Sequence, residues 1–156
     1  MLHKLFKVYL SWFGSGYAPK APGTFGTVAS LPFIYAWSLL DPSHIGNLLL
    51  TTIMTIIAIF AAEIIQQASK SHDPQWIVID EVIGMLITWS IVRPQTIIEW
   101  SLCFISFRVL DIFKIWPASY FDKQIKHGAG TILDDVVSGV YAGIIVYFTS
   151  HYFLRY

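Results

Sequence analysis

The stretch from Asn47 to Ala62 contains no charged residue, and Glu63 is the first that follows it. An uncharged apolar run of this length comes close to the ~20 residues that a helix needs to cross the hydrocarbon core of a bilayer. The whole chain has the same character, since 55% of its 156 residues are hydrophobic and only 13% are charged. Its mean hydropathy is +0.59. This composition predicts a membrane protein.

Five apolar segments predict an all-α fold, a multi-pass membrane helical bundle with about four to five membrane-embedded helices. The expected segments are residues 24–40, 47–62 with an extension to 66, 76–93, 96–113 and 136–154. Pro32 is expected to kink the first of them, and residues 114–131 are expected to form a polar loop. No internal repeat or linker is found, so residues 1–156 are predicted to form a single domain.

The segment before the first span has two parts. Apolar residues at helical spacing between Leu2 and Phe13 predict a short N-terminal interfacial helix. The alternative is an amphipathic helix packed on the protein. Residues 14–27 follow, with four glycines, two prolines and one lysine, and are expected to be neither regular helix nor strand. Such loops bring backbone N–H groups close to phosphate at a helix N-terminus, although a structural turn before a membrane helix is the alternative.

Two pairs of adjacent carboxylates interrupt the apolar pattern. Asp80 and Glu81 lie inside an apolar run, and Asp134 and Asp135 precede the last span. Carboxylates within membrane segments usually face a polar cavity and have a function there. The alternatives are a helix start in the headgroup region for the first pair and helix capping for the second.

Cationic residues complete a candidate constellation. Arg108, Asp111 and Lys114 recur at three-residue intervals and share one helix face, for which a salt-bridged stripe is the alternative. The two acidic pairs and Asp111 together offer oxygen ligands suited to Mg²⁺. Lys20, Arg108 and Lys114 offer cations suited to phosphate oxygens. Carboxylates and cations at a membrane surface indicate a phosphorylated lipid headgroup as the ligand.

Other chemistries fit the sequence less well. The formal net charge is zero, which gives no electrostatic reason to expect nucleic-acid binding. The single cysteine, Cys103, lies five positions before Arg108, whereas a cysteine phosphatase needs six, and we expect it to be a core residue. Neither an Asp-x-Asp-x-Thr run nor a Pro-Ser-Gly-His segment is present. Metal-assisted attack by water is the chemistry that remains.

The positions of the lysines predict which face of the membrane carries this site. With five spans, seven lysines flank one side and two arginines flank the other, a bias that marks the first side as cytoplasmic. The lysines are Lys4, Lys7, Lys20, Lys70, Lys114, Lys123 and Lys126, and the arginines are Arg93 and Arg155. The glycine-rich segment and all the charged motifs fall on the cytoplasmic side.

Four ordered blocks of the sequence resemble the phosphatidylglycerophosphatase A family. They are Tyr17–Thr27, Ile79–Met85, Phe107–Lys114 with Pro117, and Gly130–Asp135 with Gly139. The resemblance implies an all-helical, Mg²⁺-dependent enzyme of the bacterial inner membrane that removes the terminal phosphate of phosphatidylglycerophosphate to give phosphatidylglycerol. Ala18 stands where serine is also expected in the family.

The expected roles follow from the resemblance and the charges together. The catalytic carboxylates are expected to be Asp80, Glu81, Asp111, Asp134 and Asp135, of which Asp80, Glu81, Asp134 and Asp135 bind the metal. Substrate binding is expected from Lys20, Gly23, Thr24, Arg108, Lys114 and Thr131. The alternatives are a non-catalytic anionic-lipid-binding membrane protein, a scaffold subunit, or a lipid phosphotransferase. The sequence does not predict the oligomeric state.

Overall fold

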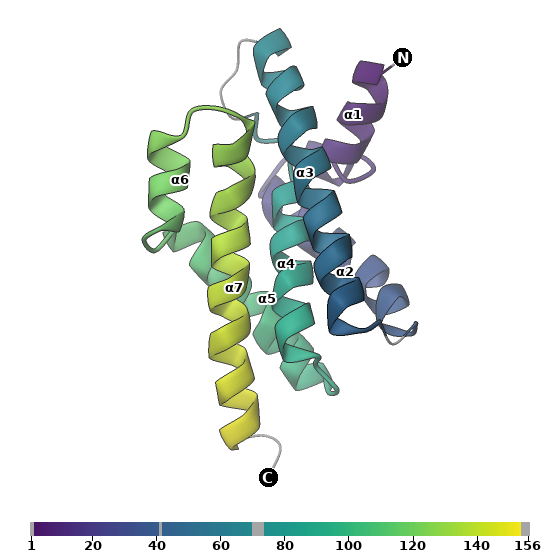
Figure 1. Cartoon of the computed structure of the whole chain (residues 1–156), viewed down its shortest axis with the longest axis vertical. Coiled ribbons are helices and arrows are strands. Elements are labelled where there is room, and N and C mark those ends of the chain that lie inside the picture. Colours follow the sequence, from purple (N-terminus) through teal and green to yellow (C-terminus); the bar gives the residue numbers. More distant parts are fainter. Residues whose placement is uncertain (1, 41, 70–73, 154–156) are drawn as a thin grey trace.

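The computed structural model describes residues 2–40, 42–69 and 74–153. Over these residues the chain forms seven α-helices and one short 3-10 helix, without a β-strand (Figure 1). The elements are α1 (Leu2–Leu10), η1 (Ser15–Tyr17), α2 (Pro22–Ser38), α3 (His44–Ser69), α4 (Ile79–Val92), α5 (Ile97–Phe113), α6 (Ala118–Gln124) and α7 (Gly128–Phe153). The predicted all-α fold is confirmed.

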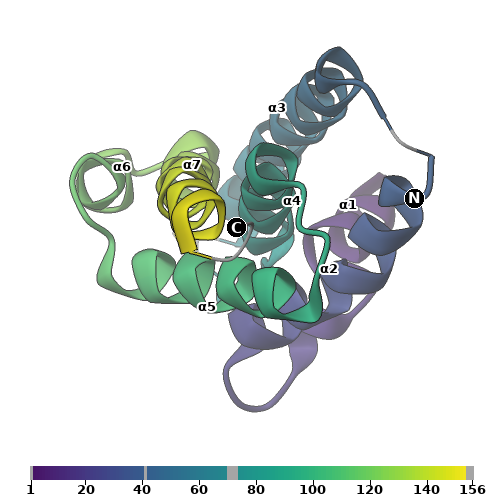
Figure 2. The same cartoon turned by 90° about the horizontal axis from the view of Figure 1, so that it is seen from below.

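Helix α4 is the centre of the bundle. It packs against α2, α3, α5 and α7, and Figure 2 shows these helices arranged around it. Its contact with α7 is close because glycines meet there: a Cβ added to Gly139 would overlap the backbone of Gly84. The Thr88 hydroxyl donates to the Gly84 carbonyl at 2.9 Å and lies 3.0 Å from that of Gly139. Small residues let neighbouring helices approach in this way.

The starts of α5 and α7 are fixed by acidic side chains. Thr96 and Glu99 form a capping box at α5, each side chain accepting from the backbone N–H of the other residue at 3.2 Å. Glu63 of α3 accepts from the backbone N–H of Gly128 at 2.8 Å and so caps α7 across a helix interface. Both satisfy N–H groups that a helix cannot pair internally.

Two helices in the described part of the chain are long and apolar enough to cross a membrane, α3 and α7, with 26 residues each. At 1.5 Å per residue each is about 39 Å long, which exceeds the ~30 Å hydrocarbon core. Only 33% and 44% of their most apolar windows are buried, so most of each window faces outward. The prediction of four to five membrane helices is supported for these two alone. These two helices indicate a membrane-associated protein.

The structure corrects two predicted loops. Helix α2 begins at Pro22, inside the glycine-rich segment expected to be irregular, because proline is well suited to a first helical position. Helix α6 and the first turn of α7 lie within residues 114–131, which were expected to be a polar loop. Asp134 and Asp135 consequently lie in the second turn of α7 and do not open it.

The N-terminal helix α1 packs on α3. The Tyr9 hydroxyl donates to the Met54 carbonyl at 2.8 Å, and the rings of Phe6 and Phe60 meet edge to face. Leu2 and Leu5, one helical turn before Phe6 and Tyr9, are themselves exposed. The helix is thus packed on the protein and also presents an apolar surface, so its interfacial position stays a prediction.

Candidate active site

Four helix segments converge at one end of the bundle around a cavity of about 310 Å³. They are the N-terminal turns of α2 and α4, the C-terminal end of α5, and the second turn of α7. Nine of the residues expected from the sequence line this cavity: Gly23, Asp80, Glu81, Arg108, Asp111, Lys114, Thr131, Asp134 and Asp135. Residues distant in sequence are thereby brought together.

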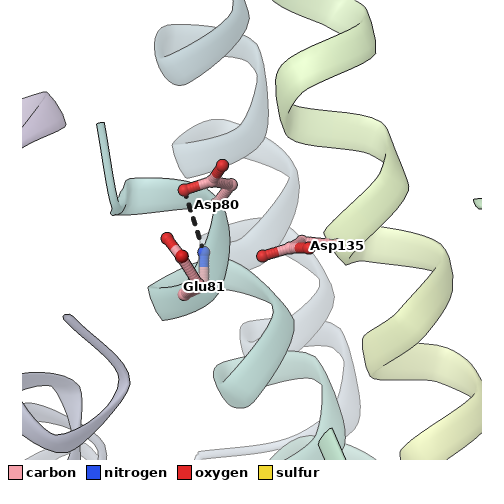
Figure 3. A group of neighbouring side chains, drawn as sticks. All are labelled: Asp80, Glu81 and Asp135. Carbon is pink, nitrogen blue, oxygen red and sulfur yellow. Dashed lines mark hydrogen bonds between the residues drawn. The ribbon is translucent and has the colours of Figure 1, made fainter. Parts of the chain in front are cut away.

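Three carboxylates from two helices lie close together in the cavity. Asp80 and Glu81 lie in the first turn of α4, where negative charge is favoured, and Asp80 accepts from the Glu81 N–H at 3.1 Å. Figure 3 shows Asp135 extending toward this pair from α7. One oxygen from each of Asp80, Glu81 and Asp135 lies within 4.8 Å of the others.

Two oxygens of this trio lack a hydrogen-bond partner. Within the described residues, Glu81 Oε2 and Asp135 Oδ2 are both buried and unpaired. Such atoms are costly to bury unless a cation or a proton compensates them. Clustered carboxylate oxygens match the ligand preference of Mg²⁺. The trio, defined here as Asp80, Glu81 and Asp135, therefore fits a divalent cation.

Asp134 takes a different partner from its neighbour. Its Oδ2 atom lies 2.6 Å from Lys114 Nζ, which also lies 2.6 Å from Asp122 Oδ1 on α6. Burial lowers the pKa of Lys114, but the carboxylates of Asp134 and Asp122 offset this and leave its pKa raised above the usual range. Lys114 therefore stays charged. Of the four expected metal ligands, the structure gathers three in the trio and pairs Asp134 with this lysine.

Arg108 connects the trio to α2. Its Nη1 atom lies 2.5 Å from Asp111 Oδ2 and 3.7 Å from Glu81 Oε1, and it lies 3.4 Å from the Thr27 hydroxyl. Its Nε atom is buried and has no hydrogen-bond partner in the described part of the chain. The expected salt bridge with Asp111 is present, and the guanidinium is held at the cavity wall.

The N-terminus of α2 adds backbone donors beside Arg108. Ala21 adopts a left-handed conformation (φ 48°) and provides no side-chain cap. Pro22 has no N–H, so the first backbone donors of this helix are those of Gly23 and Thr24, which have no acceptor within the helix and favour anions. A Cβ added to Gly23 would overlap the Glu81 carboxylate and lie 3.2 Å from Arg108 Nη2. Glycine is thus the residue that lets this turn approach the carboxylates.

Two expected substrate-binding residues lie outside the cavity lining. Lys20 is exposed and Thr24 is half-buried, and neither lines the cavity. Thr131 does line it, and its hydroxyl accepts from Gln66 Nε2 at 2.8 Å. No sequence pattern indicates Gln66 or Asp122, because both contact site residues only through tertiary packing. Thr27 lay within the glycine-rich segment but was assigned no role.

A comparison with protein families decides what kind of protein carries this site. The model of phosphatidylglycerophosphatase A matches residues 8–150. The chain belongs to the phosphatidylglycerophosphatase A family. This is a family of phosphatases, and every residue lining the cavity lies within the matched range. The protein is accordingly an enzyme.

Similar curated proteins include two that are named phosphatidylglycerophosphatase A. The phosphatidylglycerophosphatase A of Escherichia coli K12 is 36% identical over 141 residues, covering 90% of this chain and 80% of the relative. That of Haemophilus influenzae is 32% identical over 144 residues, covering 91% and 86%. A protein of Bacteroides thetaiotaomicron, provisionally named a phosphatidylinositol-3-phosphatase, is 33% identical over 142 residues, covering 86% of each chain. No solved structure matches the chain at a comparable level.

Proposed function

We propose that this member of the phosphatidylglycerophosphatase A family is a Mg²⁺-dependent enzyme that hydrolyses the terminal phosphate of phosphatidylglycerophosphate to give phosphatidylglycerol. The observation that carries the proposal is the cavity in which the Asp80, Glu81 and Asp135 trio faces Arg108 and the α2 N-terminus. The names of two relatives, from Escherichia coli and Haemophilus influenzae, support the choice of substrate.

The charges of the cavity support a bound metal ion. Five carboxylates line it, against the two cations Arg108 and Lys114. A substrate phosphate would be repelled by this excess unless another cation were present. The trio would hold Mg²⁺, with the unpaired oxygens of Glu81 and Asp135 as ligands. When bound, the ion supplies positive charge for the phosphate oxygens and acidifies water.

The protein's own side chains have distinct roles in this proposal. Arg108 and the first N–H groups of α2 bind and orient the phosphate oxygens. A carboxylate of the cavity accepts a proton as water attacks phosphorus. The new bond joins the water oxygen to phosphorus, the bond to the glycerol oxygen breaks, and that oxygen takes up a proton to become the hydroxyl of phosphatidylglycerol. Asp111 holds the guanidinium of Arg108 in place. Lys114 orients Asp134 and joins α5, α6 and α7.

We further propose that four to five helices are embedded in the bacterial inner membrane, with the cavity open to the cytoplasm. Helices α3 and α7 support a membrane location, and the excess of lysines flanking the cavity end supports its orientation. Lys70 and Arg155, which contribute to that count, lie outside the described residues. Acyl chains would stay in the bilayer while the headgroup reaches the site.

The proposal is tested with the purified protein in mixed micelles. Release of inorganic phosphate is measured from phosphatidylglycerophosphate and, in parallel, from phosphatidylinositol 3-phosphate, with Mg²⁺ or with EDTA. We expect release from the first lipid, in Mg²⁺ only. Release from the second lipid alone would reassign the substrate. Retention of phosphatidylglycerophosphate without any release would support a non-catalytic lipid-binding protein or a scaffold.

A further inference from the structure

An apolar groove of about 410 Å³ separates α2 from α5. It is lined by Val28 and Leu31 of α2 and by Ile97, Trp100, Ser101, Phe104 and Ile105 of α5. Its single hydroxyl group, on Ser101, donates to the Ile97 carbonyl of its own helix at 2.8 Å. The groove opens outward, since Val28 is 49% exposed and Ile105 is 55% exposed. It can therefore accommodate a hydrocarbon chain.

This groove lies about one helical turn from Arg108 at the wall of the cavity. On α5, Phe104 precedes Arg108 by four residues, about one helical turn, so both lie on one face. On α2, Leu31 follows Thr27 by four residues, so both lie on one face, and the Thr27 hydroxyl lies 3.4 Å from Arg108 Nη1. The contact between Thr27 and Arg108 thus joins the two helices where the polar cavity ends and the apolar groove begins.

We propose that the groove between α2 and α5 binds an acyl chain of the lipid whose phosphate occupies the cavity. This inference rests on the proposed function. A groove of similar volume between α3, α4 and α7 includes Val136, the residue after Asp135. Its lining residues on α4, however, are Ile87, Ser90 and Ile91, about two turns or more beyond Asp80 and Glu81 at the start of that helix. The neighbourhood of Gly139 and Gly143 holds no chain, because α4 fills it.

The role of the groove is orientation. An acyl chain in a bilayer is already surrounded by hydrocarbon, so entering the groove gains packing contacts and not transfer out of water. A chain fixed beside Arg108 limits the positions that its phosphate can take, which matters because small misplacements slow a reaction strongly. A substrate without acyl chains cannot use this constraint.

The test fills the groove from each wall, with Val28→Trp and Ser101→Trp. Ile53→Trp is the matched control, because Ile53 is 54% exposed on α3 and lines neither the cavity nor the groove. Each variant is assayed on phosphatidylglycerophosphate in mixed micelles and on glycerophosphoglycerophosphate, the same headgroup without acyl chains.

We expect both groove variants to lower kcat/KM for the lipid about tenfold, the size of an overpacking effect, with kcat/KM for the chain-free headgroup close to that of the unmodified protein. The control should match the unmodified protein on both substrates. Equal losses on both substrates, or unchanged kcat/KM for the lipid, would overturn the inference. Failure of the unmodified protein to hydrolyse either substrate would count against the proposed function instead.

Discussion

Replacing Gly23 by alanine tests the contact between α2 and the carboxylates. The added Cβ would overlap the carboxylate of Glu81 and lie 3.2 Å from Arg108 Nη2. The backbone of α2 is helical at this position, so alanine introduces no conformational strain there. The conflict must be relieved by the Glu81 side chain, whose carboxylate has to move by on the order of 1 Å.

This displacement of the Glu81 carboxylate should slow the reaction. A misplacement of about 1 Å can lower a rate by about 100-fold, and moving Glu81 also opens the trio. We expect Gly23→Ala to lower kcat/KM for phosphatidylglycerophosphate by about 10- to 100-fold and to raise the Mg²⁺ concentration needed for half-maximal activity. The melting temperature should change little, because the flexible end of a side chain absorbs the overlap.

The assay combines phosphate release, a Mg²⁺ titration and thermal unfolding. Gly46→Ala is the matched control, since a Cβ there meets only Ser43 Oγ at 3.4 Å and Pro42 Cβ at 3.7 Å, ordinary contacts at the start of α3. It should keep full activity. Unchanged kcat/KM and Mg²⁺ response in Gly23→Ala would refute the reasoning, because Glu81 would then have no required position.

Three further predictions concern the same end of the bundle. Asp135→Asn should abolish phosphate release and the response to Mg²⁺, whereas Asp134→Asn should mainly lower the melting temperature by weakening the Lys114 ion pair; equal effects of both on activity would contradict this division. Arg108→Lys should lower kcat/KM at least about tenfold with folding retained, because lysine cannot make bidentate contacts, and unchanged kinetics would leave Arg108 only a salt-bridge partner. A cysteine at position 126, in a Cys103→Ala background, should react with an impermeant thiol reagent only in inverted vesicles, and labelling in intact cells would reverse the proposed topology.

Much of the helical framework could be predicted from local sequence. The uncharged apolar run that begins at Asn47 predicts a helix long enough to cross a membrane, and α3 contains the whole run. Cys103 was expected in the core and is buried. Helix α6 was missed because seven residues with mixed polarity carry little periodic signal. The start of α2 was misplaced although Pro22 marks it, because the nearby glycines favoured a loop.

The sequence does not predict which of Asp134 and Asp135 joins the trio and which pairs with Lys114. Adjacent residues on a helix point about 100° apart, so which carboxylate turns toward α4 depends on how α7 is rotated about its axis. That rotation is set by tertiary packing. Lys20 was expected at the site because the glycine-rich segment carries it, but the chain turns at Ala21 and leaves the lysine exposed.

The crossing of α4 and α7 at Gly84 and Gly139 acts as a spacer for the chemistry one turn away. Asp135 precedes Gly139 by four residues, and Asp80 precedes Gly84 by four, so each carboxylate stands one turn from the crossing point. The gap between them is therefore set by the thickness of two bare backbones. A single methyl group at either glycine would widen that gap directly, because one at Gly139 would overlap the Gly84 carbonyl oxygen and one at Gly84 would lie 2.8 Å from the Asp135 carbonyl oxygen.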